Sequence, residues 1–180
     1  LVTGGQKEGP SGSWDGSFDP SLDVFQRLGD NTTAMGTVNT DFAEAEVDTR
    51  RTNLTRFPLF FPEKRTFFLE GSDIFDFGVG MGSPYHSDVV PFFSRRIGLY
   101  EGETVPLEVG GKVSGKVGNT NFGGLVTHTG KVQDLVPAAT MGAFRLRQNV
   151  LEESNVGLLA NFGDPSGKEG SYLVGADATY

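Results

Sequence analysis

The sequence predicts an all-β protein folded as an antiparallel meander, and three observations support this prediction. Apolar and polar residues alternate through most of residues 105–180, which is the pattern of strands with two unlike faces. Glycine accounts for 26 of the 180 residues, about twice its average share, and turn-forming pairs recur along the chain. No long stretch has the period of an amphipathic helix.

The length of the chain fits one domain, so residues 1–180 are predicted to form a single β domain. Residues 1–31 are rich in turn residues, and within them only the first few residues and Val24–Leu28 have the composition of strands. Prolines and glycines then interrupt any regular ladder at about 49–66 and 72–104. Both ranges are therefore predicted to be irregular inserts.

The clearest strands follow residue 105. Turns are predicted at 118–121 and 163–170, and strands are predicted between them at 122–129, 140–150 and 156–162. The strand before the first turn is expected to carry on one face Leu107, Val109, Gly111, Val113, Gly115 and Val117. The whole chain offers about seven or eight strands.

The last predicted strand has an apolar row bracketed by tyrosines. This row is Tyr172, Val174, Ala176, Ala178 and Tyr180. Its length suits a tilted strand that crosses a bilayer, where aromatic residues lie at both interfaces. A water-soluble β-sandwich gives the same alternation, and by this strand alone the sandwich is slightly favoured.

Charge and composition exclude some partners and ligands. The formal net charge is −8 and the pI is about 4.7, so the chain has no basic surplus for binding nucleic acid. The chain has no cysteine, so it has neither a disulfide nor a thiolate metal site. His86 and Asp88 lie two residues apart, but no third metal ligand lies near them in the sequence. We therefore predict no metal and no cofactor.

The densest chemistry lies between residues 33 and 71. Read as a strand, residues 41–48 place three carboxylates on one face, and basic side chains follow at once. Such a set fits the polar interior of a wide barrel, and an exposed strand beside a charged loop is an equal alternative from periodicity alone. The candidate binding or lumenal charge cluster is Glu44, Glu46, Asp48, Arg50, Arg51, Arg56, Glu63, Lys64 and Arg65.

The same span resembles the signature of a known family. The match covers Asn53–Phe57, Leu59–Arg65 and Phe67–Gly71, and it resembles domain-of-unknown-function family 5916. A second landmark of that family is similar to Phe92–Gly98. The departures are small, such as Thr66 where the family often has proline.

This resemblance implies a setting that the residue patterns alone leave open. Proteins of the family look like bacterial outer-membrane β-barrels, usually preceded by a module similar to carbohydrate-binding family 9. The resemblance thus implies an outer-membrane location, membrane lipid as a partner, and an upstream carbohydrate-binding-like module in the parent protein. It shifts the balance from a sandwich to an outer-membrane-type β-barrel, of which this chain is expected to be an incomplete fragment.

Three functional hypotheses follow. The first is a barrel segment whose charge cluster handles or transports a polar solute such as carbohydrate. The second is a carbohydrate-active hydrolase of the O-glycosyl type, with Glu44, Glu46, Glu63 and Glu70 as carboxylate candidates. Against it, the pKa of Glu63 is expected to be lowered by its basic neighbours, so no catalytic residue is assigned. The third is a structural or assembly surface that uses Phe60, Phe61, Phe67 and Phe68.

Overall fold

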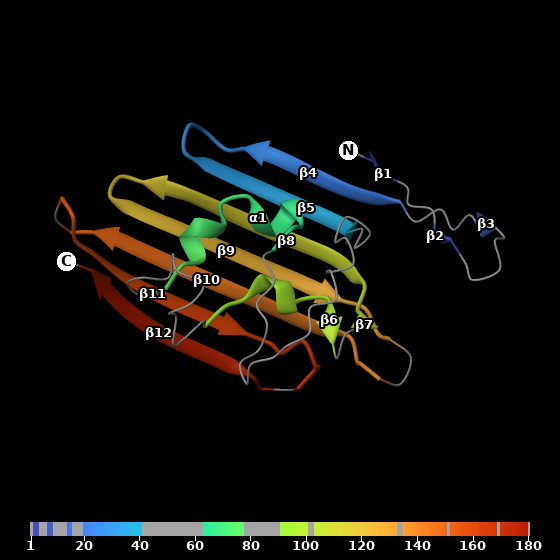
Figure 1. The fold of residues 1–180 in the computed structure, drawn as a ribbon. Helices are drawn as coiled ribbons and strands as arrows, with labels where there is room; N and C mark the ends of the chain where they lie inside the picture. The colour runs from blue at the N-terminus through green and yellow to red at the C-terminus, as the bar shows by residue number, and fades with distance from the viewer. Residues whose placement is uncertain are drawn as a thin grey trace, which may run out of the picture.

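The protein is an open antiparallel sheet with a helical insert on one face (Figure 1). The computed structural model describes residues 2–3, 7–8, 14–15, 20–40, 63–77, 91–100, 103–132, 135–150, 152–168 and 170–179. The main sheet has eight strands in the order β1-β4-β5-β8-β9-β10-β11-β12. From β8 onward each strand pairs with the next in sequence, so the predicted all-β antiparallel meander is confirmed.

The elements have the following bounds. The main sheet contains β1 (Val2–Thr3), β4 (Ser21–Arg27), β5 (Thr32–Thr40), β8 (Leu107–Val117), β9 (Thr120–Thr129), β10 (Ala139–Asn149), β11 (Asn155–Phe162) and β12 (Tyr172–Thr179). Two separate two-stranded ladders are β2 (Lys7–Glu8) with β3 (Trp14–Asp15), and β6 (Leu99–Tyr100) with β7 (Glu103–Thr104). The insert contains α1 (Thr66–Leu69) and the 3-10 helices η2 (Ser72–Phe75) and η3 (Ser94–Arg96). Among the described residues, no helix is long and apolar enough to cross a membrane.

Strand register divides the side chains of the sheet between two faces, because directly paired residues of antiparallel strands share a face. Phe144 of β10, for example, pairs with Gly124 of β9 and with Ala160 of β11. We name one side the apolar face. Its exposed large residues are Leu22, Val24, Val38, Val109, Val113, Val117, Val126, Phe144, Val156, Leu158, Phe162, Tyr172 and Val174.

The opposite side, which we name the insert face, carries the insert and the hydrophobic core (Figure 1). Phe67 of α1 is 1% exposed, and residues of α1, of η2 and of the segment just after η3 join it in the core. The insert contributes Phe67, Phe68, Ile74, Phe75 and Ile97, and the strands contribute Met35, Leu107, Leu125, Ala139, Met141 and Ala143. Aromatic rings of the insert thus pack on small and flexible side chains of the main sheet.

The structure corrects two details of the sequence prediction. The alternation predicts Leu107 beside Val109 on one face, but the pairing of β8 with β9 shifts register between these residues. Leu107 therefore turns to the insert face, where it is fully buried, while Val109 stays exposed on the apolar face. The pattern also did not single out residues 32–40 as the strand β5. The strand predicted at 41–48 lies outside the described residues.

Candidate functional site

The predicted charge cluster is described only at its C-terminal end. Glu63, Lys64 and Arg65 are described. Six members lie outside the described residues: Glu44, Glu46, Asp48, Arg50, Arg51 and Arg56. Pairing between the acidic strand and the basic residues therefore stays a prediction. The same holds for the inserts predicted at about 49–66 and 72–104, whose central residues are not described.

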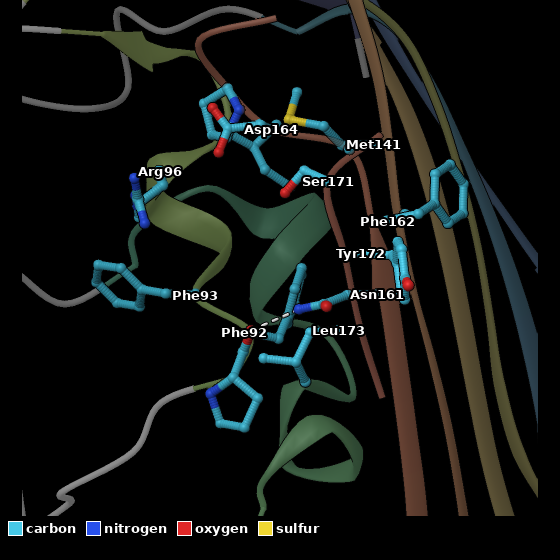
Figure 2. A pocket seen from close by; sticks show the side chains of 15 residues that line it. Phe92, Phe93, Arg96, Met141, Asn161, Phe162, Asp164, Ser171, Tyr172 and Leu173 are labelled. Carbon is cyan, nitrogen blue, oxygen red and sulfur yellow. Dashed lines mark hydrogen bonds between the residues drawn. The ribbon is translucent and has the colours of Figure 1, made fainter. Parts of the chain in front are cut away.

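A cavity of about 250 Å³ lies where η3 meets the connection between β11 and β12 (Figure 2). Phe92 and Arg96 line it from the insert, and Asn161, Asp164 and Ser171 line it from the sheet. Asn161 donates a hydrogen bond to the carbonyl oxygen of Pro91, so the strand holds the start of this segment. The cavity joins aromatic surface to a guanidinium, an amide and a carboxylate.

Asp164 is fixed as a carboxylate at the rim of this cavity. The backbone N–H of Ser166 donates to its Oδ1 at 2.8 Å, and the Ser166 hydroxyl donates to the same oxygen. The Ser166 hydroxyl bond is the main cause of a lowered pKa at Asp164, and Arg96 and Lys168 add to it against the effect of burial. The cavity therefore presents a stable negative charge close to Arg96.

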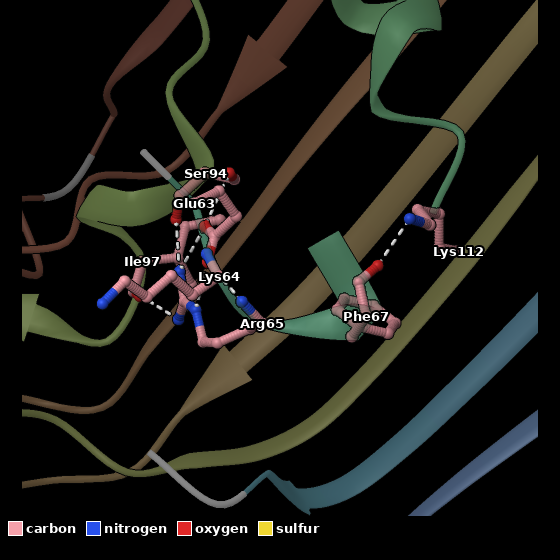
Figure 3. A network of polar contacts seen from close by, with 7 residues as sticks. All are labelled: Glu63, Lys64, Arg65, Phe67, Ser94, Ile97 and Lys112. Atoms are coloured by element: carbon pink, nitrogen blue, oxygen red, sulfur yellow. Dashed lines mark hydrogen bonds and ion pairs between the residues drawn. The ribbon is translucent and has the colours of Figure 1, made fainter. Parts of the chain in front are cut away.

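Arg65 is the centre of a buried polar network, and it is 4% exposed (Figure 3). Its Nε donates to Glu63 Oε1 and its Nη2 donates to Glu63 Oε2, both at 2.8 Å. Nη1 donates to the carbonyl oxygen of Ile97 at 2.7 Å, and Nη2 also donates to that of Ser94 at 2.9 Å. The guanidinium carbon lies 4.2 Å from the centre of the Phe68 ring. Such a fork of donors suits arginine alone among the basic residues.

Glu63 has a full set of donors around its carboxylate. The Ser94 hydroxyl donates to Oε2 at 2.8 Å, and the backbone N–H groups of Lys64 and Arg65 donate to Oε1 at 3.1 Å. Burial acts to raise the pKa of Glu63, but the hydrogen bonds and charge of Arg65, with the Ser94 bond, lower it overall. The predicted direction of this pKa is confirmed. A carboxylate held ionised in this way is unsuited to act as a general acid.

This network joins two segments that are far apart in the sequence. Glu63 and Arg65 precede α1, whereas Ser94 and Ile97 belong to and follow η3. They lie within Leu59–Arg65 and Phe92–Gly98, the two stretches that carry the family resemblance. Sequence reasoning expected Arg65 to pair with an acidic strand and missed these partners. Both stretches belong to one family signature, and this was the sign in the sequence that they contact each other.

Lys112 of β8 holds the insert on the main sheet (Figure 3). Its side chain is buried, at 4% exposure. Its ammonium group donates to the backbone carbonyls of Phe67 and Glu70 at the end of α1. The Lys112 Nζ also lies 5.5 Å from the centre of the Phe67 ring. A cation at the C-terminus of a helical turn satisfies carbonyls that have no partner within that turn. Sequence analysis assigned Lys112 no role.

Glycines of the insert face form sockets for side chains of the insert. A Cβ added at Gly110 would lie 3.0 Å from Phe67 Cζ, and one added at Gly123 would lie 2.6 Å from Ile74 Cγ2. A Cβ at Gly175 would lie 2.9 Å from Phe77 Cζ. Any larger residue at these three positions displaces the insert or the strand, since real Cβ atoms rarely come so close to other heavy atoms. The insert is thus seated on β8, β9 and β12.

A second buried ion pair crosses the wall near the last strand. Arg145 of β10 donates from Nη1 and Nη2 to the two carboxylate oxygens of Asp177 in β12, each at 2.7 Å. The guanidinium carbon of Arg145 lies 5.4 Å from the centre of the Phe77 ring, which comes from the insert. Among the described residues, no group of three or more His, Asp or Glu side chains is placed to hold a metal ion. His86 and Asp88 lie outside those residues.

The fold and these contacts define a class of protein: an antiparallel sheet with one exposed apolar face and an opposite face on which a folded insert packs through an apolar core and buried ion pairs. The family model described as "Domain of unknown function (DUF5916)" matches residues 4–115, which is more than half of the chain. The chain therefore belongs to this family. The matched range includes the whole insert and ends within β8. Comparison with curated proteins and with solved structures found no match.

Proposed function

We propose that this chain forms part of the wall of a bacterial outer-membrane β-barrel and that its insert forms a plug on the lumenal side. The observation that carries the proposal is the apolar face, to which β4, β5 and each of β8–β12 contribute exposed large apolar side chains. Water-soluble monomers rarely expose an apolar patch of more than a few hundred Å². Strands of membrane barrels, in contrast, direct apolar residues outward to lipid and polar residues inward.

Strand length supports this assignment. The strands β8 to β12 have between 8 and 11 residues. At a rise of about 3.3 Å per residue they extend about 26 to 36 Å. The apolar band of an outer-membrane barrel is about 25 Å tall, and its strands are tilted. A tilted strand needs about 9 to 11 residues to cross this band, so β8, β9 and β10 are long enough, whereas the eight residues of β11 and of β12 are about one residue short.

An aromatic pair supports it further. Phe162 at the end of β11 is paired with Tyr172 at the start of β12, and both side chains belong to the exposed apolar face. Tyr172 is 80% exposed. Aromatic residues form girdles where the strands of a membrane barrel enter the interface between lipid and water. This pair suits one such girdle.

The cavity beside η3 suits contact with a polar solute, because its lining includes Arg96, Asn161 and Asp164. Lys112, Arg145 and Arg65 are instead buried in contacts within the insert or between the insert and the sheet. Carbohydrate is the solute class that the family resemblance suggests, because members of the family usually carry a carbohydrate-binding-like module. We propose that the parent barrel handles or transports such a solute past the insert.

The two other hypotheses receive less support. For a glycoside hydrolase, Glu63 is the described candidate, and its lowered pKa and full set of donors disfavour a role as general acid. An assembly surface requires exposed aromatic side chains. Phe67 and Phe68 are 1% and 3% exposed in the core, so these two residues serve packing and do not support that hypothesis.

The experiment is fractionation of cells that produce the parent protein. We expect the protein in the outer-membrane fraction, released only by detergent and migrating differently in gels before and after heating. Recovery as a monodisperse protein without detergent would contradict a membrane wall. The solute is tested separately by uptake of neutral oligosaccharides into liposomes that contain the purified barrel. If the liposomes take up amino acids but exclude oligosaccharides, carbohydrate is not the solute, and the proposal of a membrane barrel still stands.

A further inference from the structure

The connections at the two ends of the sheet differ in length. At one end lie the short turns 28–31, 118–119 and 150–154. At the other end lie the connections 41–106, 130–138 and 163–171. In Figure 1 the short turns lie together at the left of the sheet, and the connections from β9 to β10 and from β11 to β12 lie at the right and below. Because the sheet is a meander, this difference holds for every connection between successive strands from β4 to β12, the β5 to β8 connection containing the insert.

Two of the long connections pack against each other as an ordered rim. Gly167 lies against Pro137, so closely that a Cβ added at Gly167 would lie 2.2 Å from the Pro137 ring. Within 163–171, the N–H of Gly163 donates to the carbonyl oxygen of Ser171 at 2.9 Å. Within 130–138, the N–H of Val132 donates to the carbonyl oxygen of Val136 at 3.0 Å. These contacts hold the two connections together at this end of the sheet.

We propose that this end, with connections 41–106, 130–138 and 163–171, faces the cell exterior. The inference rests on the proposed function, because it applies a rule of outer-membrane barrels: their periplasmic turns are short and their extracellular loops are longer. The insert then enters the lumen from the outside, and the turn at 118–119 faces the periplasm. A membrane wall in the opposite orientation would place its longest connection in the periplasm.

The orientation assigns a role to the cavity beside η3. Its lining residue Asn161 comes from the end of β11, and Asp164 and Ser171 come from the connection between β11 and β12. They therefore lie at the exterior end. A solute that approaches from the medium then meets the Arg96 and Asp164 charges at this end of the sheet.

Single cysteines test the orientation, and the chain itself has no cysteine that would add background. Lys168 and Asn119 are both exposed, and they lie at opposite ends of the sheet. K168C and N119C would be made in the parent protein, with the unsubstituted protein as blank. Cells are treated with a maleimide on a polyethylene glycol chain too large to pass porins, before and after the outer membrane is permeabilised.

We expect K168C to be labelled in intact cells and N119C only after permeabilisation. The reverse pattern would overturn the orientation and leave the membrane wall intact. Equal labelling of both sites in intact cells, or equal protection of both until permeabilisation, would also overturn the orientation. Equal protection together with recovery of the protein in the soluble periplasmic fraction would overturn the proposed function itself, which separates the two failures.

Discussion

Arg145 and Asp177 form a two-pronged ion pair that passes over β11 at Gly157. A Cβ added at Gly157 would lie 2.4 Å from Asp177 Oδ1 and 2.6 Å from Arg145 Nη1, so only glycine leaves room for the pair. The side chain of Arg145 is 1% exposed and that of Asp177 is 9% exposed. Three strands are therefore tied at one point on the insert face, and the tie depends on a residue that contributes no side chain.

The first prediction concerns this tie. Asp177→Asn leaves the buried Arg145 guanidinium without its carboxylate, and losing one member of a buried pair costs about 3 to 5 kcal/mol. Urea unfolding of the parent protein in detergent measures the loss. As a control, Glu152→Gln changes an exposed carboxylate in the β10–β11 turn and should alter stability by no more than about 0.5 kcal/mol. Equal effects of the two substitutions would show that the pair is not desolvated.

The second prediction uses two neighbouring glycines of β8. Gly110→Ala places a methyl group 2.9 Å from Thr37 Cγ2 and 3.0 Å from Phe67 Cζ, so it pushes α1 off the wall. Gly111→Ala points to the apolar face, where nothing lies within 4 Å. We expect Gly110→Ala to destabilise by about 1 to 3 kcal/mol. Gly111→Ala should be neutral or slightly stabilising, and protease cleavage within residues 63–77 should rise only in the first variant. Similar results for both variants would argue against a seated insert.

The third prediction is a pH dependence set by Glu63. Its pKa is lowered in the folded protein from an ordinary value of 4.5, chiefly because Arg65 and Ser94 outweigh the effect of burial. Its contribution to stability is therefore complete above about pH 4.5 and is lost as the pH falls through the folded-state value. Glu63→Gln should reduce the loss of free energy of unfolding on acidification. Ser94→Ala should reduce this loss by a smaller amount. A loss on acidification that is unchanged in Glu63→Gln would contradict the network.

The fourth prediction concerns the apolar face at Ala176 of β12. Arginine on the lipid side of a barrel costs about 2 to 4 kcal/mol at the bilayer midplane. Ala176→Arg should therefore impair insertion, whereas Ala176→Leu, which is larger but apolar, should insert as well as the parent. The fraction of unheated protein that migrates in gels as the folded form, and shifts only after heating, measures insertion. Should both variants insert equally, the face does not meet lipid.

The alternation of residues made the wall predictable. Strands β8 to β12 and the turn at 118–119 follow from the pattern, because each strand has one apolar side and one polar side. The strand β5 does not show that pattern, since threonine occupies both of its faces. The bulge at Leu107 is a local shift of register, and alternation alone gives no sign of it.

The candidate site was less predictable, because its contacts join distant segments. Glu63 was predicted to have a lowered pKa from its neighbours in sequence, and it does. The Ser94 and Ile97 partners of Arg65, and the Asp177 partner of Arg145, lie about 30 residues away along the chain. Only the folding of the insert onto the wall and the pairing of the strands bring them together.

The most direct measurement of the central claim is a scan of spin labels along β12 in the parent protein reconstituted into lipid bilayers. Oxygen concentrates in lipid, whereas a charged nickel complex stays in water, so the two relaxing agents distinguish the faces. Labels at Val174, Ala176 and Ala178 should be accessible to oxygen and protected from nickel, and labels at Leu173 and Thr179 should not share this behaviour. If positions 174, 176 and 178 are instead accessible to nickel, the apolar face lies in water and the account of a membrane wall is contradicted.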